Sequence, residues 1–204
     1  MARIDDYVAA KKLAVEKLAS DSLETITTRS GFEATGEDSF RVPFLGKIQQ
    51  VSYPEFDFKP EGEGEKENPI QEQVLVLHYL LAPGAPISGN WVAYREIPGA
   101  SFYFSAFVKR AIDPLKKMFG ADVSLLVKAA EKLGGRAIDA GDAGYEFTVF
   151  PRVPIQLILW EGDEEFPAEA NILFDDTVGG LLSPEDIAWL AGMLVYRLMG
   201  LARG

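Results

Sequence analysis

Residues 145–176 read YEFTVFPRVPIQLILWEGDEEFPAEANILFDD and decide the fold. In the first run, Tyr145, Phe147 and Val149 fall on every second residue, which is the period of an extended strand with one buried face. The second run, residues 155–160, is apolar at both alternate sets of positions except Gln156. A strand that is apolar on both faces is typical of an interior position, so we expect it to be covered on each side.

The two runs are joined by a short connection that Pro151 and Pro154 bracket. Proline has no N–H to donate to a strand ladder, so the runs are expected to meet as a hairpin with its loop centred on Arg152 and Val153. The sequence therefore predicts an α+β fold: a mainly antiparallel sheet with a central hairpin at about 145–161, packed by about five helices.

Helical spacing of apolar residues and recognisable start signals place the helices. Pro69 and Pro184 each follow a residue type that caps helices, Asn68 and Ser183, and proline is favoured at a first helical position. Pro114 is expected to kink the helix predicted at 102–119. The predicted helices cover residues 3–19, about 70–81, 102–119, 123–133 and a stretch that begins at Ser183.

Shorter apolar runs indicate further strands. Residues 39–44 and 47–53 form a strand pair around Gly46, and Pro43 suggests that the first of them lies at a sheet edge. Residues 89–99 and 170–176 complete the set.

The chain of 204 residues fits a single domain, 1–204, with a mobile acidic loop at about 55–69. Glycines alternate with charged residues in that loop, which favours a solvated linker over a cation site built from Glu61, Glu63, Glu65 and Glu67.

The composition of the chain argues against several kinds of site and partner. The chain has no cysteine, so it holds no disulfide, no thiol nucleophile and no iron–sulfur cluster of its own. A net charge of −11 opposes binding to nucleic acid or to an anionic membrane. Basic partners or metal cations fit that charge better, and the partner is expected to be a small molecule or a protein. The N-terminal stretch lacks the uninterrupted apolar core of a signal peptide, so we expect a cytoplasmic protein.

The strand after the hairpin ends in a cluster of carboxylates: Glu161, Asp163, Glu164 and Glu165. Like charges about 4 Å apart repel by roughly 4 kcal/mol at an effective dielectric constant of 20, so water, a cation or an arginine must offset the cost. A solvated or arginine-pinned loop is the first interpretation. Catalysis by Asp163, Glu164 or Glu165 as acid or base is the second.

A metal site is the third interpretation of the same cluster. If the loop folded against Asp175, then Asp163, Glu165 and Asp175 would offer oxygen ligands that suit Mg²⁺ or Ca²⁺. The cofactor is otherwise unknown from the sequence, because the chain has no calcium-loop signature and only one histidine.

Aromatic residues near strand ends suggest a pocket for a small ligand, lined by Tyr94, Arg95, Tyr103 and Trp160. The densest basic patch, Lys109, Arg110, Lys116 and Lys117, suits an anion, although a solvated helix face is the favoured interpretation.

Three stretches of the chain stand out: VLVLHYLLA with GNWVAYREIPG, then FVKRAIDPLKKMFG, then PIQLILWEGDEEFPAEANILFD with SPEDIAWL. Together they resemble the domain of unknown function 3786 family, which is found chiefly in anaerobic bacteria and archaea. The resemblance spans roughly residues 20–200 and implies no established reaction. In some members an iron–sulfur segment precedes the domain, which implies a link to anaerobic redox or one-carbon metabolism.

Three function classes stay open at this point. A ligand- or partner-binding module fits the absence of a complete catalytic set. A carboxylate-dependent hydrolase or isomerase would use the acidic cluster. A structural subunit of a larger assembly would display a large exposed apolar patch.

Overall fold

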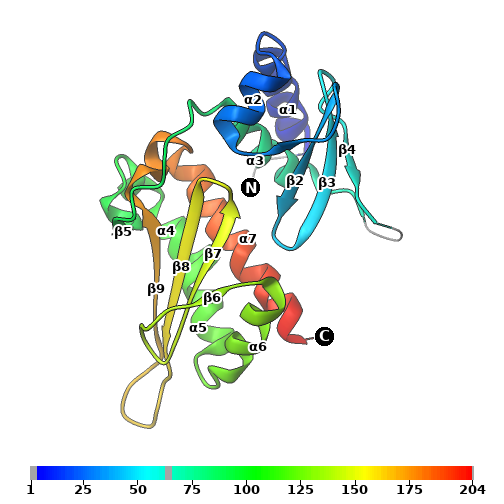
Figure 1. Cartoon of the computed structure of the whole chain (residues 1–204). Helices are drawn as coiled ribbons and strands as arrows, with labels where there is room; N and C mark the ends of the chain where they lie inside the picture. The colour runs from blue at the N-terminus through cyan, green and yellow to red at the C-terminus, as the bar shows by residue number, and fades with distance from the viewer. Residues whose placement is uncertain (1–3, 63–65, 204) are drawn as a thin grey trace. The chain divides into compact units, whose positions relative to one another are not determined.

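The computed structural model describes residues 4–62 and 66–203 (Figure 1), and the chain divides into two compact units, Met1–Ala85 and Pro86–Gly204. The fold is α+β, as predicted, but the strands form two antiparallel sheets where the sequence indicated one. The division falls at Ala85, outside the acidic loop. Single-domain behaviour stays a prediction.

The first unit contains a four-stranded sheet in the order β1–β2–β3–β4, counted over its described residues. The predicted strand pair is confirmed as β2 (Ser39–Phe44) and β3 (Lys47–Ser52), which are antiparallel. Pro43 was expected at an edge, but β2 lies between two strands. The outer neighbour, β1 (Glu33–Ala34), pairs only with Phe40 and Arg41, so β2 has a partner on one side alone at Pro43.

The helices of the first unit are α1 (Ile4–Leu18), α2 (Leu23–Ser30) and α3 (Ile70–Leu81). Helix α3 confirms the prediction of a helix at about 70–81, and α1 confirms the prediction of a helix at 3–19 over the residues that the structure describes. The sequence analysis missed α2, a short and largely polar helix that Ser22 caps by accepting the N–H of Thr25 at 3.1 Å. The expected cap on α3 is wrong, because its N-cap is Pro69 and no side chain caps it.

Residues 55–69 contain more structure than a loop. Strand β4 (Phe58–Pro60) pairs with β3, and both Phe56 and Phe58 are buried. Glu61 forms an ion pair with Arg41, with Nε and Oε2 2.8 Å apart. The apolar rings therefore anchor the first half of this segment, while Glu63 and Glu65 lie outside the described residues.

The second unit is built on a five-stranded sheet in the order β5–β9–β8–β7–β6. The predicted hairpin is confirmed: β7 (Ala143–Phe150) and β8 (Val153–Trp160) are antiparallel. Its turn comprises Pro151 and Arg152, since Val153 already belongs to β8. The other strands are β5 (Trp91–Ala93), β6 (Arg136–Ala137) and β9 (Glu169–Asp175). The run 155–160 thus lies in the central strand.

Helices cover one face of this sheet (Figure 1). A continuous helical run consists of α4 (Phe104–Phe107), the π-helical turn η3 (Val108–Ile112) and α5 (Asp113–Phe119), and is followed by α6 (Ser124–Leu133) and α7 (Pro184–Arg203). Pro114 has no N–H to donate to the carbonyl four residues earlier, and the π-helical turn ends at Ile112, two residues before it. The opposite face of β8 was expected to be covered as well: Pro154 and Ile158 on that face are buried and Gln156 is half-buried, whereas Trp160 at the strand end is 41% exposed.

The capping signal at the start of α7 is confirmed, because the hydroxyl of Ser183 accepts the N–H of Asp186 at 3.2 Å. In the described part of the chain, no helix combines the length and the apolar character that crossing a bilayer requires.

Candidate functional site

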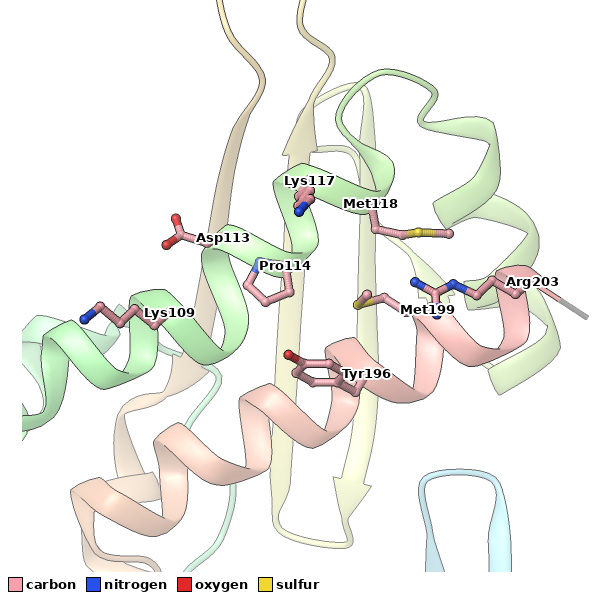
Figure 2. A pocket seen from close by; sticks show the side chains of 8 residues that line it. All are labelled: Lys109, Asp113, Pro114, Lys117, Met118, Tyr196, Met199 and Arg203. Atoms are coloured by element: carbon pink, nitrogen blue, oxygen red, sulfur yellow. The ribbon is translucent and has the colours of Figure 1, made fainter. Parts of the chain in front are cut away.

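A groove of about 440 Å³ lies between the helical run of η3 and α5, here called the α5 segment, and the C-terminal half of α7 (Figure 2). We call it the α5–α7 groove. This volume falls within the range of small-molecule sites, which is about 300–1,000 Å³. The residues that line it come from two helices far apart in the sequence: Lys109, Asp113, Pro114, Lys117, Met118, Tyr196, Met199 and Arg203.

Close helix packing positions the two walls of this groove. A Cβ atom on Gly192 of α7 would lie 3.2 Å from the carbonyl oxygen of Arg110, so any larger residue here would require η3 or α7 to shift by a few tenths of an ångström. The Arg110 guanidinium also lies over the Trp189 ring, 4.6 Å from its centroid. These contacts hold α7 against the neighbouring helix, and the next turns of α7 supply Tyr196 and Met199.

The groove combines an apolar wall with a charged rim. Pro114, Met118 and Met199 are half-buried, and Figure 2 shows the α7 side chains facing those of the α5 segment. The thioethers of methionine are flexible and polarisable, so such a wall adapts to apolar ligands of different shape. The exposed Tyr196 ring extends the same surface.

The rim is positive within an acidic unit. Residues 86–204 contain eleven Lys and Arg residues and sixteen Asp and Glu residues, a net charge of −5. The groove gathers three of those cations, Lys109, Lys117 and Arg203, with one carboxylate, Asp113. No ion pair joins these four side chains to any described residue. The three cations are therefore available to an anionic ligand.

A second, smaller pocket of about 260 Å³ lies beside β9. Its lining includes Tyr94 and Arg95, two of the four residues predicted to bind a ligand, and continues with residues of β5, α4, η3 and β9: Ala93, Phe104, Phe107, Val108, Ile112, Ala170, Asn171 and Ile172. We call it the β9 pocket.

Tyr94 is a structural member of this pocket. Its ring stacks on Phe107 with centroids 4.2 Å apart, and its hydroxyl donates to the carbonyl of Pro184 at 2.7 Å. Burial raises the pKa of the Tyr94 phenol to about 12, so the hydroxyl stays protonated. Arg95 is exposed, and its guanidinium lies 3.7 Å above the centroid of the Phe104 ring.

The other two predicted ligand residues do not line either pocket. Tyr103 packs edge-on against Phe102, with centroids 5.1 Å apart. Trp160 alternates with Leu159 on β8 and so points to the sheet face opposite the helices. The predicted set of four is therefore split, because the period of the strand places Trp160 on the other side.

The acidic cluster after β8 lies in an exposed loop. Asp163 accepts the N–H groups of Phe166 at 2.7 Å and Glu165 at 2.8 Å, and these bonds hold the pKa of Asp163 below its ordinary value. A general acid needs a raised pKa, which this arrangement opposes for Asp163. Glu164 and Glu165 are exposed to water. Catalysis by these three residues stays a prediction.

The predicted metal set of Asp163, Glu165 and Asp175 does not assemble. Asp175 pairs with Trp91 at one end of β9, whereas the loop joins the other end at Glu169, roughly 20 Å along the strand. Asp175 is 1% exposed and accepts the N–H groups of Gly89 at 2.7 Å and Ser88 at 3.0 Å. Among the residues the structure describes, no three acidic or histidine side chains are placed to hold a metal ion.

Hydrogen bonds offset the cost of burying the Asp175 carboxylate. Burial alone would raise the pKa of Asp175, but bonds from Thr177, Gly89 and Ser88 outweigh burial and hold the pKa below its ordinary value. The carboxylate thereby attaches the start of the second unit to the end of β9.

Sequence reasoning found half of the α5–α7 groove. It identified Lys109 and Lys117 as a basic patch, and it missed the partners on α7. The available signal is helical spacing, since Tyr196, Met199 and Arg203 recur at intervals of three and four residues and so share one face.

The family model described as "Domain of unknown function (DUF3786)" matches residues 22–197, most of the chain. The chain belongs to this family. No curated protein and no solved structure matches it. The DUF3786 match covers parts of both units and the whole β9 pocket. Two groove residues, Met199 and Arg203, lie beyond the matched range.

Proposed function

We propose that the chain is a binding module for a small amphipathic anion, taken up in the α5–α7 groove. One observation carries the proposal: three cationic side chains with no ion pair to a described residue surround an apolar wall in a chain whose net charge is −11. The ligand class is an aromatic or aliphatic body that ends in a phosphate or carboxylate.

Each part of the groove supports one part of that ligand. Lys117 and Arg203 provide charged donors, which form the stronger hydrogen bonds to anions. Met118 and Met199 provide dispersion contacts for the apolar body. Asp113 disfavours a second negative charge at its end of the groove, which favours ligands with a single anionic end.

Binding to 1-naphthyl phosphate tests the proposal by isothermal titration calorimetry, with 1-naphthol and inorganic phosphate as separate arms. The account predicts saturable binding of the naphthyl phosphate and far weaker binding of either part alone. Loss of one charge-assisted contact in Lys117→Gln or Arg203→Gln is expected to weaken binding about tenfold.

Lys128→Gln is the matched control, because it removes the same charge from an exposed position of α6 that does not line the groove. Equal affinity for all three variants, or equal binding of 1-naphthol, would refute the proposal. Raised ionic strength is expected to weaken binding in the wild type.

The link to anaerobic redox or one-carbon metabolism, a cytoplasmic location and the absence of a nucleic-acid partner remain predictions of the sequence. A hydrolase or isomerase reaction has no comparable support, because the described carboxylates do not converge on either pocket except Asp113.

A further inference from the structure

The outer edge of β9 is only partly paired. In the order β5–β9–β8–β7–β6, strand β5 covers Leu173, Phe174 and Asp175, and the ladder then stops at Ala93. Residues 169–172 of β9 pair with β8 on the inner side, and no strand lies on their outer side within the described chain.

Strand alternation identifies which backbone groups face outward. The N–H of Asp176 donates to the carbonyl of Asn90 at 2.9 Å, so this residue directs its peptide groups toward β5. Because direction alternates along a strand, Phe174, Ile172 and Ala170 share this orientation. No described backbone group pairs with Ala170 or Ile172 on this side. Two N–H donors and two carbonyl acceptors therefore line the open edge.

The β9 pocket lies at the same place. Ala170 and Ile172 contribute to its lining, together with Val108 and Ile112 from the helical layer. Side chains of paired residues on neighbouring strands point to the same face of a sheet. A residue paired with Ile172, which is buried on the helix-covered face, would therefore direct its side chain into the pocket. Its volume of about 260 Å³ falls below the usual small-molecule range and suits one large apolar side chain.

The charge of the pocket rim adds a third element. Arg95 lines the pocket and stacks on Phe104, and no ion pair joins its guanidinium to a described residue. A guanidinium that is fixed on an aromatic ring presents its remaining N–H groups to a carboxylate.

We propose that the edge of β9 at residues 169–172 binds an extended segment of a partner protein by β-strand addition, with an apolar side chain in the β9 pocket and a neighbouring acidic side chain on Arg95. Backbone hydrogen bonds supply the attraction, and the pocket and Arg95 select the sequence. This inference is independent of the anion site between α5 and α7.

Fluorescence polarisation with a labelled, acetylated peptide tests the inference on the full chain. In the peptide, threonine alternates with valine, leucine and glutamate, so the last three share one face. We expect saturable binding, and we expect about fivefold or greater loss when leucine becomes alanine or glutamate becomes lysine. Amide hydrogen exchange at Ala170 and Ile172 should slow in the complex.

Ala170→Pro is the diagnostic variant. It removes an outward N–H that bonds to nothing in the described chain, and edge strands tolerate proline at such positions. We expect about fivefold or greater loss of peptide affinity with an unchanged melting temperature. Ile158→Val is the matched control, because Ile158 lies on the neighbouring strand β8, where it pairs with Asn171, and does not line the pocket. That variant should bind like the wild type.

Three results would overturn the inference. The first is no saturation by any peptide up to about 1 mM. The second is binding that Ala170→Pro leaves unchanged. The third is protection of the Ala170 and Ile172 amides that appears with rising protein concentration alone, which would assign the edge to a second copy of this chain. If Ala170→Pro impairs folding, N-methylation of the peptide backbone gives the same test. Methylation of every second residue removes either the N–H groups that face β9 or those that face away, so only one of the two methylated peptides should lose binding.

Discussion

The two units use their sheets differently. In the first unit, β2 alternates buried Phe40, Val42 and Phe44 with more exposed residues, which is the pattern of a strand with one core face. In the second unit, β8 is buried at nearly every position because it is the central strand. Alternation thus identifies a strand and its inner face, whereas a continuous apolar run identifies a centre.

Both pockets described above belong to the second unit, and both combine residues from distant parts of the chain. Lys109 and Arg203 lie on different helices, and Ala93 meets Ile172 where a short edge strand ends. Short edge strands and helix termini contribute little to a core, and in this unit they supply part of the lining of both pockets.

Truncation of a core ring in each unit has the largest expected effect. Phe40→Ala and Phe174→Ala each remove a fully buried side chain, and each should lower the free energy of unfolding by about 3–5 kcal/mol. All three tryptophans, Trp91, Trp160 and Trp189, belong to the second unit. Urea unfolding followed by tryptophan fluorescence and by circular dichroism therefore separates the two cores.

We expect Phe174→Ala to shift the fluorescence midpoint and Phe40→Ala to shift only part of the circular dichroism signal, because each unit has its own buried core. A common shift of both signals in Phe40→Ala would support the single-domain prediction and contradict independent cores in the two units. Phe102→Ala, which removes an 86% exposed ring, is the control and should change neither midpoint.

The next largest effect is expected from two carboxylates, Asp175 at the end of β9 and Asp163 in the loop that precedes this strand. Asp175→Asn should cost about 2–3 kcal/mol at neutral pH, since it weakens several charge-assisted hydrogen bonds at a buried site. Asp163→Asn, in an exposed loop, should cost clearly less. Thermal unfolding over a pH series measures both.

The sign of the pH dependence follows from the pKa of Asp175. Its folded pKa is lowered, so its stabilisation is present above the unfolded value of about 3.9 and is lost as the pH falls through the folded pKa. The difference between wild type and Asp175→Asn should therefore shrink below about pH 4. A difference that stays constant to lower pH would contradict the role given to this carboxylate.

Ion pairs on the two sheets have the smallest expected effects. In the second unit, the mostly buried Glu146 carboxylate forms an ion pair with Arg136 at 2.7 Å and accepts a hydrogen bond from the Gln156 amide at 3.0 Å. Glu146→Gln should therefore lower the free energy of unfolding by up to about 1 kcal/mol. The pair of Arg41 with Glu61 in the first unit is exposed on both sides, and Glu61→Gln should leave the melting temperature unchanged at physiological salt. A larger loss in Glu61→Gln would reverse the ranking.

Much of the fold was predictable because its signals are local. Alternation and proline positions gave the hairpin of β7 and β8, and Ser183 with Pro184 gave the start of α7. The helix α2 was missed because its eight residues are mostly polar and carry no long apolar stripe. The second sheet was missed because periodicity does not show which strands pair.

The candidate site was less predictable because its residues meet only after folding. Tyr94 and Arg95 do line a pocket, yet Trp160 points to the other face and Tyr103 packs on Phe102. The metal set that includes Asp175 requires the acidic loop to fold against this residue, which the sequence alone does not test. The neighbours of Asp175, the amides of Ser88 and Gly89, come from a segment far upstream, and composition does not reveal them.

Methyl NMR of methionine-labelled protein during titration with 1-naphthyl phosphate shows directly whether an amphipathic anion occupies the α5–α7 groove. The chain has four methionines, of which Met118 and Met199 line the α5–α7 groove and Met193, also on α7, does not. The account predicts saturable shifts of the Met118 and Met199 methyl signals, lost in Arg203→Gln, with Met193 unchanged. Equal shifts of Met193, or no shift of the two groove methionines at saturating ligand, would contradict it.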